Sequence, residues 1–189
     1  MSRHCFVVIE GIDGVGKTTV AELLASMLNA ELIKTPLPPF EAFRTFYDEC
    51  GNPTARFLYY LSVVVLSSSK IHEILEKRDV ICDRYIFLTI AYHYAMGVDA
   101  NIIDINRLPI IIPDCSICLT VEETVRYQRL VGRKGHVKPY DEQDTLYLDN
   151  VKTLLKDLCS CVIDTTHYNP IEVVSLILSM LNPVRAPNV

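Results

Sequence analysis

The chain has 189 residues, of which 50% are hydrophobic and 22% are charged, and its formal net charge at pH 7 is -5. This length suits a single folded domain, and the composition excludes an intrinsically disordered chain. The acidic balance argues against nucleic acid as a partner, because nucleic-acid binders usually carry a basic face.

No apolar segment of the sequence is long enough to cross a bilayer. The longest apolar run, 57–66, is too short and contains Ser62. The N-terminus leads from Arg3 and His4 straight into an apolar run and a glycine loop, without the pattern of a signal peptide. We therefore expect a cytoplasmic protein with no membrane partner.

The seven cysteines are an odd number, which indicates reduced thiols rather than a disulfide framework. The spacing of Cys115 with Cys118, and of Cys159 with Cys161, allows a zinc site. Alternatively, these cysteines are small apolar residues on core strands and bind no metal. This alternative is favoured because structural zinc sites usually have two ligand pairs of matched spacing.

Short apolar runs alternate with longer helical stretches along the chain. The pattern predicts strands over 5–9, 31–34, 79–82, 117–121 and 161–164. It predicts helices over 17–29, 40–49, 53–77, 85–96, 122–132, 141–158 and 170–181. Helices between strands supply the crossover connections that a parallel sheet requires. We expect one α/β domain over residues 1–189.

A glycine-rich segment lies between the first strand and the first helix. Residues 11–18 read GIDGVGKT and match the P-loop pattern GxxxxGK[ST]. In a P-loop the backbone N–H groups converge on phosphate oxygens, the lysine binds the β- and γ-phosphates, and the hydroxyl binds Mg²⁺. The motif predicts a three-layer P-loop NTPase fold that binds ATP and Mg²⁺. The residues expected at the triphosphate are Gly11, Asp13, Gly14, Val15, Gly16, Lys17, Thr18 and Thr19.

An acidic and a basic residue follow the third predicted strand. Asp83 and Arg84 stand at its carboxyl end, the edge of an open parallel sheet where ligands bind. There Asp83 can hold Mg²⁺ through water, together with Thr18, and Arg84 can bind a phosphate with its forked guanidinium. A surface ion pair that caps the next helix is the alternative.

Several motifs occur together in an order and spacing that resemble the thymidylate kinase family of P-loop nucleoside monophosphate kinases. They cover nearly the whole chain, at 11–19, 83–85, 91–92, 113–114 and 162–164. The resemblance implies a kinase that transfers a phosphoryl group from ATP to a deoxynucleoside monophosphate, converting dTMP to dTDP. It also implies a small-molecule nucleotide as the partner, and a homodimer.

The resemblance assigns roles to individual residues. Asp13 matches the aspartate that reaches the 3′-hydroxyl of the acceptor sugar, and Arg84 matches the arginine on the acceptor phosphate. Tyr92 matches the tyrosine that disfavours a ribose 2′-hydroxyl. Arg44 resembles a second arginine near that phosphate, and Tyr59 or Tyr60 stands where an aromatic ring stacks on the base. The acceptor residues expected are Asp13, Arg44, Tyr59, Tyr60, Arg84, Thr89, Tyr92 and His93.

A basic segment after the fourth predicted strand resembles the family's lid, placed here at about residues 132–141. A lid closes over the triphosphate and keeps water from the transferring phosphoryl group. Some family members carry a catalytic arginine in the P-loop, where this chain has Gly14, so the resemblance implies a lid-borne arginine instead. A solvated basic helix face is the alternative. The catalytic residues expected are Lys17, Asp13, Arg84, Arg129 and Arg133.

Three features depart from the family pattern on the acceptor side. Residues 35–39, TPLPP, replace a Glu-Pro-Gly-Gly run, and Ser62 or a neighbour stands where the third helix should carry an arginine. His93 replaces a glutamine, and it either contacts a different base or fills space as a buried histidine. The departures leave open a kinase for another nucleotide or a nucleoside, or a non-catalytic nucleotide-binding protein.

The third predicted helix also carries an apolar face. It consists of Leu58, Leu61, Val64 and Val65. This face suits either a subunit interface or the core of the domain, and the sequence leaves both alternatives open.

Overall fold

The computed structural model describes residues 4–38, 40–99, 102–132 and 145–185. The strands are β1 (Phe6–Glu10), β2 (Glu31–Lys34), β3 (Val80–Asp83), β4 (Cys115–Thr120) and β5 (Cys161–Asp164). The helices are α1 (Lys17–Leu28), α2 (Glu41–Glu49), α3 (Pro53–Leu75), α4 (Ile86–Ala95), α5 (Glu123–Val131), α6 (Thr145–Leu158) and α7 (Pro170–Arg185). A short 3-10 helix covers Ile105–Arg107.

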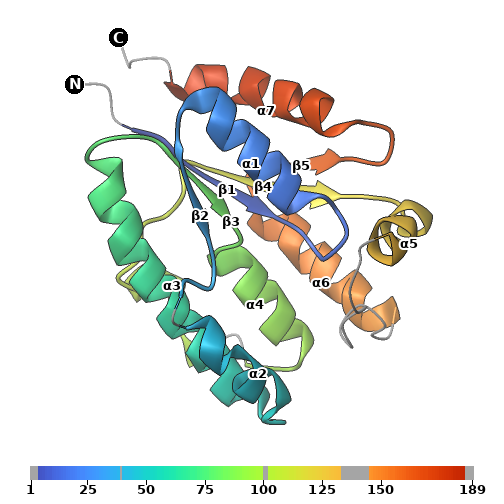
Figure 1. The fold of residues 1–189 in the computed structure, drawn as a ribbon. Coiled ribbons are helices and arrows are strands. Elements are labelled where there is room, and N and C mark those ends of the chain that lie inside the picture. Colours follow the sequence, from blue (N-terminus) through green and yellow to red (C-terminus); the bar gives the residue numbers. More distant parts are fainter. Residues whose placement is uncertain (1–3, 39, 100–101, 133–144, 186–189) are drawn as a thin grey trace.

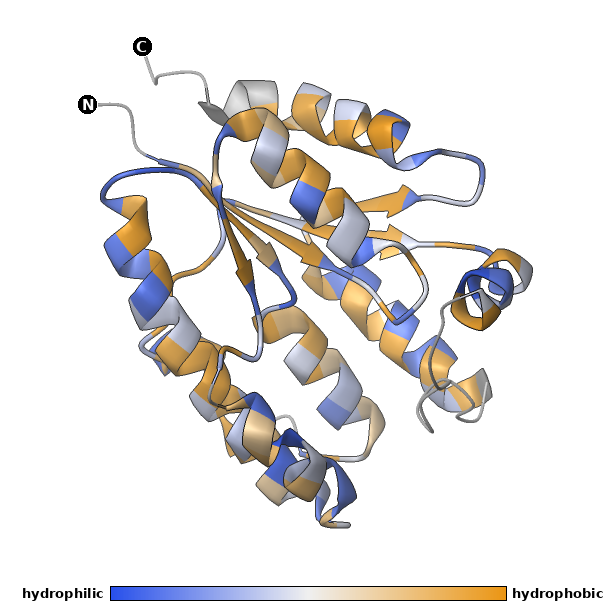
Figure 2. Cartoon of the chain, in the orientation of Figure 1, coloured by the Kyte–Doolittle hydropathy of each residue, from blue (hydrophilic) through white to orange (hydrophobic). Residues whose placement is uncertain are grey.

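The strands form one parallel sheet in the order β2-β3-β1-β4-β5, and helices cover both of its faces (Figure 1). α1 and α7 lie side by side on one face, while α3, α4 and α6 lie along the other. The strands are mostly hydrophobic, whereas each helix carries a mixture of hydrophobic and hydrophilic residues (Figure 2). This is the pattern of a sheet that is buried on both sides. The predicted three-layer α/β fold is confirmed.

The central strand β1 supplies side chains to both faces of the sheet. All of its residues are buried. Val7 and Ile9 join the hydrophobic cluster that contains α1 and α7, while Phe6 and Val8 join the cluster that contains α3. The alternation follows from the two-residue period of a strand. Each fully buried aliphatic or aromatic side chain contributes about 1.5–3 kcal/mol of stability.

Strand β4 begins earlier than the predicted strand over 117–121. Asp114 causes the difference, because its carboxylate accepts a hydrogen bond from the Phe6 N–H at 2.8 Å and its own N–H donates to the Phe6 carbonyl at 2.9 Å. These contacts bring Cys115 into register with Val7 of β1. The 3-10 helix has no counterpart in the prediction. The predicted lid beyond Gly132, with Arg133 in it, lies outside the described residues.

The carboxyl ends of the central strands meet at one edge of the sheet. Ile9 of β1 is paired with Asp83 of β3 on one side and with Ile117 of β4 on the other. The P-loop segment leaves β1 at this edge, and Arg84 follows β3 next to it. The register therefore brings together two motifs that are more than sixty residues apart in the sequence.

Three findings bear on the expectations raised by composition. No helix in the part of the chain that the structure describes is long and apolar enough to cross a bilayer. Two pairs of thiols lie in contact, Cys115 with Cys161 and Cys118 with Cys159, and all of these cysteines are free. Among the described residues no group of three or more histidine, cysteine or acidic side chains is placed to hold a metal ion.

Candidate active site

The P-loop runs from the end of β1 to α1, which begins at Lys17. Gly16, the residue before α1, has a φ of 99°, in the left-handed region that glycine adopts without strain. The loop folds back so that Lys17 Nζ donates a hydrogen bond to the Ile12 carbonyl at 2.7 Å. The segment therefore forms a loop at the N-terminus of a helix, where backbone N–H groups and the helix dipole favour an anion.

Gly11 and Gly16 differ in how tightly the loop is packed around them, which gives a matched pair of variants. A Cβ at Gly11 would lie 2.6 Å from the Leu119 carbonyl oxygen, in a residue with a φ of +142°, whereas a Cβ at Gly16 would meet nothing within 4 Å. We expect Gly11→Ala to cost roughly 3 kcal/mol of stability, and Gly16→Ala only about 1 kcal/mol from its left-handed backbone. Thermal unfolding of both variants measures the difference. Equal losses would contradict the close contact between the P-loop and β4.

Asp13 and Arg84 form an ion pair between the P-loop and the residue that follows β3. Lys17 Nζ lies 3.5 Å from the same Asp13 oxygen and is 4% exposed. Burial, and then the positive charge of Arg84, lowers the pKa of Lys17 to about 8. Two cations therefore share one carboxylate at this point. Such a group attracts phosphate, because an anion relieves the repulsion between the cations.

Thr18 and Asp83, the predicted metal-binding residues, lie in contact. The Thr18 hydroxyl donates a hydrogen bond to Asp83 Oδ2 at 2.6 Å. Asp83 is 1% exposed, and its Oδ1 is buried and has no hydrogen-bond partner within the described residues. A hydroxyl and a carboxylate oxygen are the hard ligands that Mg²⁺ takes, directly or through water. These two side chains therefore fit the predicted cation.

Glu10, the last residue of β1, supports the turn that carries Arg84, and sequence reasoning missed it. Its Oε1 accepts hydrogen bonds from the N–H groups of Tyr85 at 3.1 Å and Leu88 at 3.2 Å, at the N-terminus of α4. Burial raises the pKa of Glu10 to about 7. Arg84 has a φ of 75°, and the Thr35 hydroxyl donates to its carbonyl at 2.9 Å. These contacts stabilise a left-handed residue that would otherwise cost about 1–2 kcal/mol.

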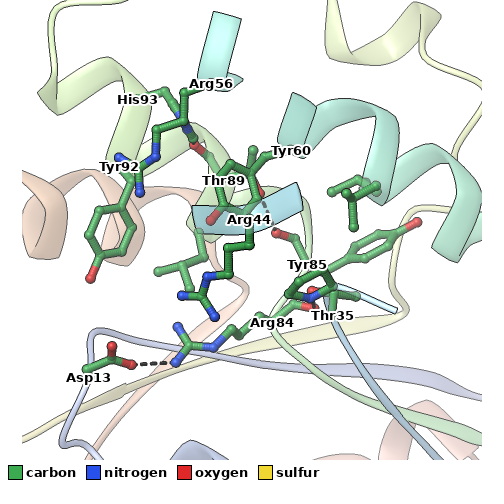
Figure 3. A pocket seen from close by; sticks show the side chains of 14 residues that line it. Asp13, Thr35, Arg44, Arg56, Tyr60, Arg84, Tyr85, Thr89, Tyr92 and His93 are labelled. Carbon is green, nitrogen blue, oxygen red and sulfur yellow. Dashed lines mark hydrogen bonds and ion pairs between the residues drawn. The ribbon is translucent and has the colours of Figure 1, made fainter. Parts of the chain in front are cut away.

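A pocket of about 750 Å³, open solvent included, lies next to the Asp13–Arg84 pair. Figure 3 shows these two residues at one end, with the Arg44 guanidinium pointing toward Arg84, and it shows Arg56 and His93 at the other end. Three arginines line the pocket, and each is paired with a carboxylate: Arg84 with Asp13, and Arg44 and Arg56 with Asp48. Of the predicted acceptor residues, the structure brings together Asp13, Arg44, Tyr60, Arg84, Thr89, Tyr92 and His93.

Tyr59 is the predicted acceptor residue that does not line the pocket. It is 8% exposed, its ring stacks on Tyr47 at a centroid distance of 4.4 Å, and its hydroxyl donates to the Phe40 carbonyl at 2.6 Å. Successive helical residues point about 100° apart, so only one of the two tyrosines can face the pocket. That residue is Tyr60.

The long helix α3 does bring an arginine into the pocket, at a position that sequence reasoning missed. Ser62 is exposed, and its hydroxyl donates to a carbonyl of its own helix at 2.7 Å. Arg56 lines the pocket instead, with its Cζ 5.5 Å from the centre of the Tyr60 ring. Val63 and Val64 complete this wall. The spacing of these four pocket residues is that of one helix face, and this signal could have identified Arg56.

His93 fills space in the far wall of the pocket. It is 2% exposed, and its Nδ1 lies 2.6 Å from the Thr89 carbonyl, so the proton is assigned to Nδ1 and Nε2 is an acceptor. Nε2 is also buried, without a hydrogen-bond partner in the described part of the chain. Burial, with a smaller contribution from the charge of Arg56, lowers the pKa of His93 to about 4. The histidine is buried, and a contact between it and the acceptor base stays a prediction.

The lowered pKa of His93 predicts a loss of stability in acid. The ordinary value is 6.5 and the folded value about 4, so His93 stays neutral in the folded protein while the unfolded chain takes up a proton. Its contribution is present above pH 6.5 and is lost as the pH falls toward 4. Between pH 7 and pH 5 it amounts to about 2 kcal/mol.

Urea unfolding of the wild type and His93→Gln at both pH values isolates this effect. Every other titrating group, Glu10 included, is common to the two proteins. We expect the wild type to lose more stability between pH 7 and pH 5 than the variant, and an identical pH dependence would contradict the assignment.

The arginines of α5 contact the P-loop backbone rather than the pocket. Arg126 Nη1 donates to the Asp13 carbonyl at 3.2 Å, and Arg129 Nη1 lies 3.4 Å from the Val15 carbonyl. Arg129 also donates to the backbone that follows β5 at 3.0 Å. In this conformation the two side chains hold the P-loop against α5. The catalytic roles of Arg129 and of Arg133 stay predictions.

A parallel sheet with a P-loop at its carboxyl edge, and an arginine-lined pocket that faces the loop, define a P-loop kinase. The model of the thymidylate kinase family matches residues 9–177. This chain belongs to the thymidylate kinase family.

Individual relatives agree with this assignment. The probable thymidylate kinase of Methanocaldococcus jannaschii is 32% identical over 198 residues, which cover 97% of this chain and 99% of that protein. The thymidylate kinase structure from Ehrlichia chaffeensis has a TM-score of 0.67 at 27% identity and covers 95% of this chain and 98% of its own. The thymidylate kinase structure from Candida albicans has a TM-score of 0.76 at 21% identity, covers 96% of this chain and 92% of its own, and supports the fold alone.

Proposed function

We propose that this protein transfers the γ-phosphoryl group of ATP to dTMP and releases ADP and dTDP. The observation that carries the proposal is the pocket beside the P-loop, which has the guanidinium groups of Arg44 and Arg84 at its P-loop end. Guanidinium groups bind phosphate through two parallel hydrogen bonds, so the pocket favours a phosphorylated acceptor over an uncharged nucleoside. Membership of the thymidylate kinase family makes dTMP the first acceptor to test.

The reaction needs positioning and charge neutralisation rather than a general base, because the acceptor phosphate is already an anion near neutral pH. An acceptor oxygen forms a bond to the γ-phosphorus of ATP while the bond to the departing ADP oxygen breaks. Lys17 neutralises charge on the β- and γ-phosphates. Arg84 turns from Asp13 to the acceptor phosphate, and Asp13 becomes available to the sugar 3′-hydroxyl. We propose Arg129, at the end of α5, and Arg133, in the predicted lid, as the further catalytic arginines.

Mg²⁺ is the cation that we propose for Thr18 and Asp83. When bound with ATP it supplies positive charge at the transferring phosphoryl group. The Thr18 hydroxyl would be a direct ligand, and the buried Asp83 carboxylate would hold a water ligand in place.

We also infer a homodimer, in line with the family. Leu61 and Val64, two of the residues considered for its interface, are 5% and 2% exposed and belong to the core. Leu58 and Leu66 of α3 are 51% and 46% exposed and give the helix an apolar outer surface. Light scattering should report twice the mass of the chain, and a monomer at micromolar concentration would contradict the inference.

A coupled ADP-release assay over a panel of acceptors tests the proposed function. The panel contains dTMP, dUMP, dCMP, dGMP and thymidine, each with ATP and Mg²⁺. We expect the highest kcat/KM with dTMP and no turnover of thymidine. Turnover of another monophosphate without dTMP would reassign the acceptor, and ATP binding without transfer to any acceptor would contradict a kinase function.

A further inference from the structure

The Asp48 carboxylate, near the end of α2, contacts three residues that line the acceptor pocket. Its Oδ1 accepts hydrogen bonds from Arg56 Nε at 2.8 Å and from the Tyr60 hydroxyl at 2.8 Å. Its Oδ2 accepts one from Arg44 Nε at 3.3 Å. Asp48 itself does not line the pocket. One carboxylate thus connects side chains of two different helices from behind the pocket wall.

The three contacts span the length of the pocket. Arg44 directs its guanidinium toward Arg84, at the end nearest the P-loop, whereas Arg56 lies at the opposite end beside His93 (Figure 3). A nucleotide whose phosphate faces the P-loop has its base at that opposite end. Asp48 is therefore hydrogen-bonded to residues at both ends of the pocket, where the phosphate and the base of the proposed acceptor would lie.

Helix α2 has few other contacts that could fix the position of Arg44. None of its side chains is buried, and Phe43 and Phe46 are 58% and 68% exposed. Besides the contacts of Asp48, the ring of Tyr47 stacks on Tyr59 of α3, with the planes 8° apart, and the Tyr59 hydroxyl donates to the Phe40 carbonyl just before α2. Arg44 itself also contacts Tyr60. With so little buried apolar surface, the placement of the helix depends strongly on individual polar contacts.

Charge makes the contact with Asp48 hard to replace. The side chains of Asp48 and Arg56 are 14% and 11% exposed. A largely buried guanidinium needs an anion, because its desolvation is otherwise uncompensated. Without the carboxylate, Arg44 and Arg56 would also repel each other across the helix contact.

We propose that Asp48 is a positioning residue for the acceptor nucleotide, holding Arg44 at the phosphate end and Tyr60 and Arg56 at the base end in one arrangement. This inference rests on the proposed function, because it concerns the pocket that receives the acceptor. It assigns Asp48 to acceptor binding, and neither to ATP binding nor to the transfer step.

Asp48→Asn and Glu49→Gln form a matched pair for the test. Both remove one negative charge from the end of α2, but Glu49 is exposed. Steady-state kinetics would vary dTMP and ATP separately, with thermal unfolding as a check on the fold. For Asp48→Asn we expect the KM for dTMP to rise about tenfold, while the KM for ATP and kcat at saturating dTMP change less than about twofold. Glu49→Gln should match the wild type.

A double-mutant cycle separates positioning from an independent effect of charge. If Asp48 acts partly through Arg44, the rise in KM for dTMP in Asp48→Asn/Arg44→Met is smaller than the product of the two single rises. An unchanged KM for dTMP in Asp48→Asn, an equal rise in the KM for ATP, or strictly multiplicative effects would overturn the inference. A wild-type protein that neither phosphorylates nor binds dTMP overturns the proposed function itself, so the two failures are distinguishable.

Discussion

Lys17→Ala should abolish phosphoryl transfer while leaving the fold intact, with kcat lowered by at least about a thousandfold. Lys17 is 4% exposed, and its ammonium lies against the Ile12 carbonyl and near Asp13, at the point where a triphosphate would meet the P-loop. Its ammonium is held inside the loop by the Ile12 carbonyl, so the substitution removes the positive charge that the P-loop itself offers to the γ-phosphate.

The fold should survive because burying the Lys17 ammonium is itself unfavourable. Burial lowers its pKa to about 8, which means that the protein disfavours the charged form relative to water. Lys70→Ala, on the exposed surface of α3, is the control and should keep full activity. The measurements are kcat with saturating ATP and dTMP, and the melting temperature. A Lys17→Ala variant that retained more than about a tenth of the wild-type kcat would contradict the assignment of the P-loop lysine.

Arg84→Ala is expected to lower kcat/KM for dTMP by about a hundredfold to a thousandfold. The guanidinium is paired with Asp13 beside the pocket, so its loss removes the cation closest to the P-loop end of the acceptor site. Alanine keeps the left-handed backbone at a φ of 75° with the same steric cost as arginine. The variant therefore tests the side chain and not the turn.

The control for Arg84→Ala is Arg78→Ala. Arg78 is 55% exposed and pairs with Glu31 at the sheet edge, so its removal should leave both substrates unaffected. The binding of ATP to Arg84→Ala, measured by calorimetry without dTMP, should stay within about threefold of the wild type. An unchanged kcat/KM for dTMP would show that the acceptor phosphate binds elsewhere.

The sequence predicted the helices, the strands and the P-loop well, because all of them depend on local patterns. Buried strands, amphipathic helices and glycine positions are set within a few residues of one another. The position of Asp83 and Arg84 beside the P-loop also followed, since parallel strands end at the same edge of a sheet. These predictions needed no knowledge of how helices pack on one another.

The side chains that depend on contacts between helices were harder to predict. Asp48 contacts Arg56 and Tyr60 across the gap between α2 and α3, and no local pattern predicts such a pairing. Glu10 reaches the N-terminus of α4 from β1, again through a contact distant in sequence. The sequence did not tell which of Tyr59 and Tyr60 faces the pocket, because that depends on which side of α3 is turned toward it.

The identity of the product tests the central claim most directly. Wild-type protein would be incubated with ATP, Mg²⁺ and dTMP, and the products followed by phosphorus nuclear magnetic resonance. We expect dTDP and ADP to appear in equal amounts, and we expect Lys17→Ala to form neither. Release of ADP and inorganic phosphate without dTDP, or no change in dTMP while ATP is bound, would contradict the claim.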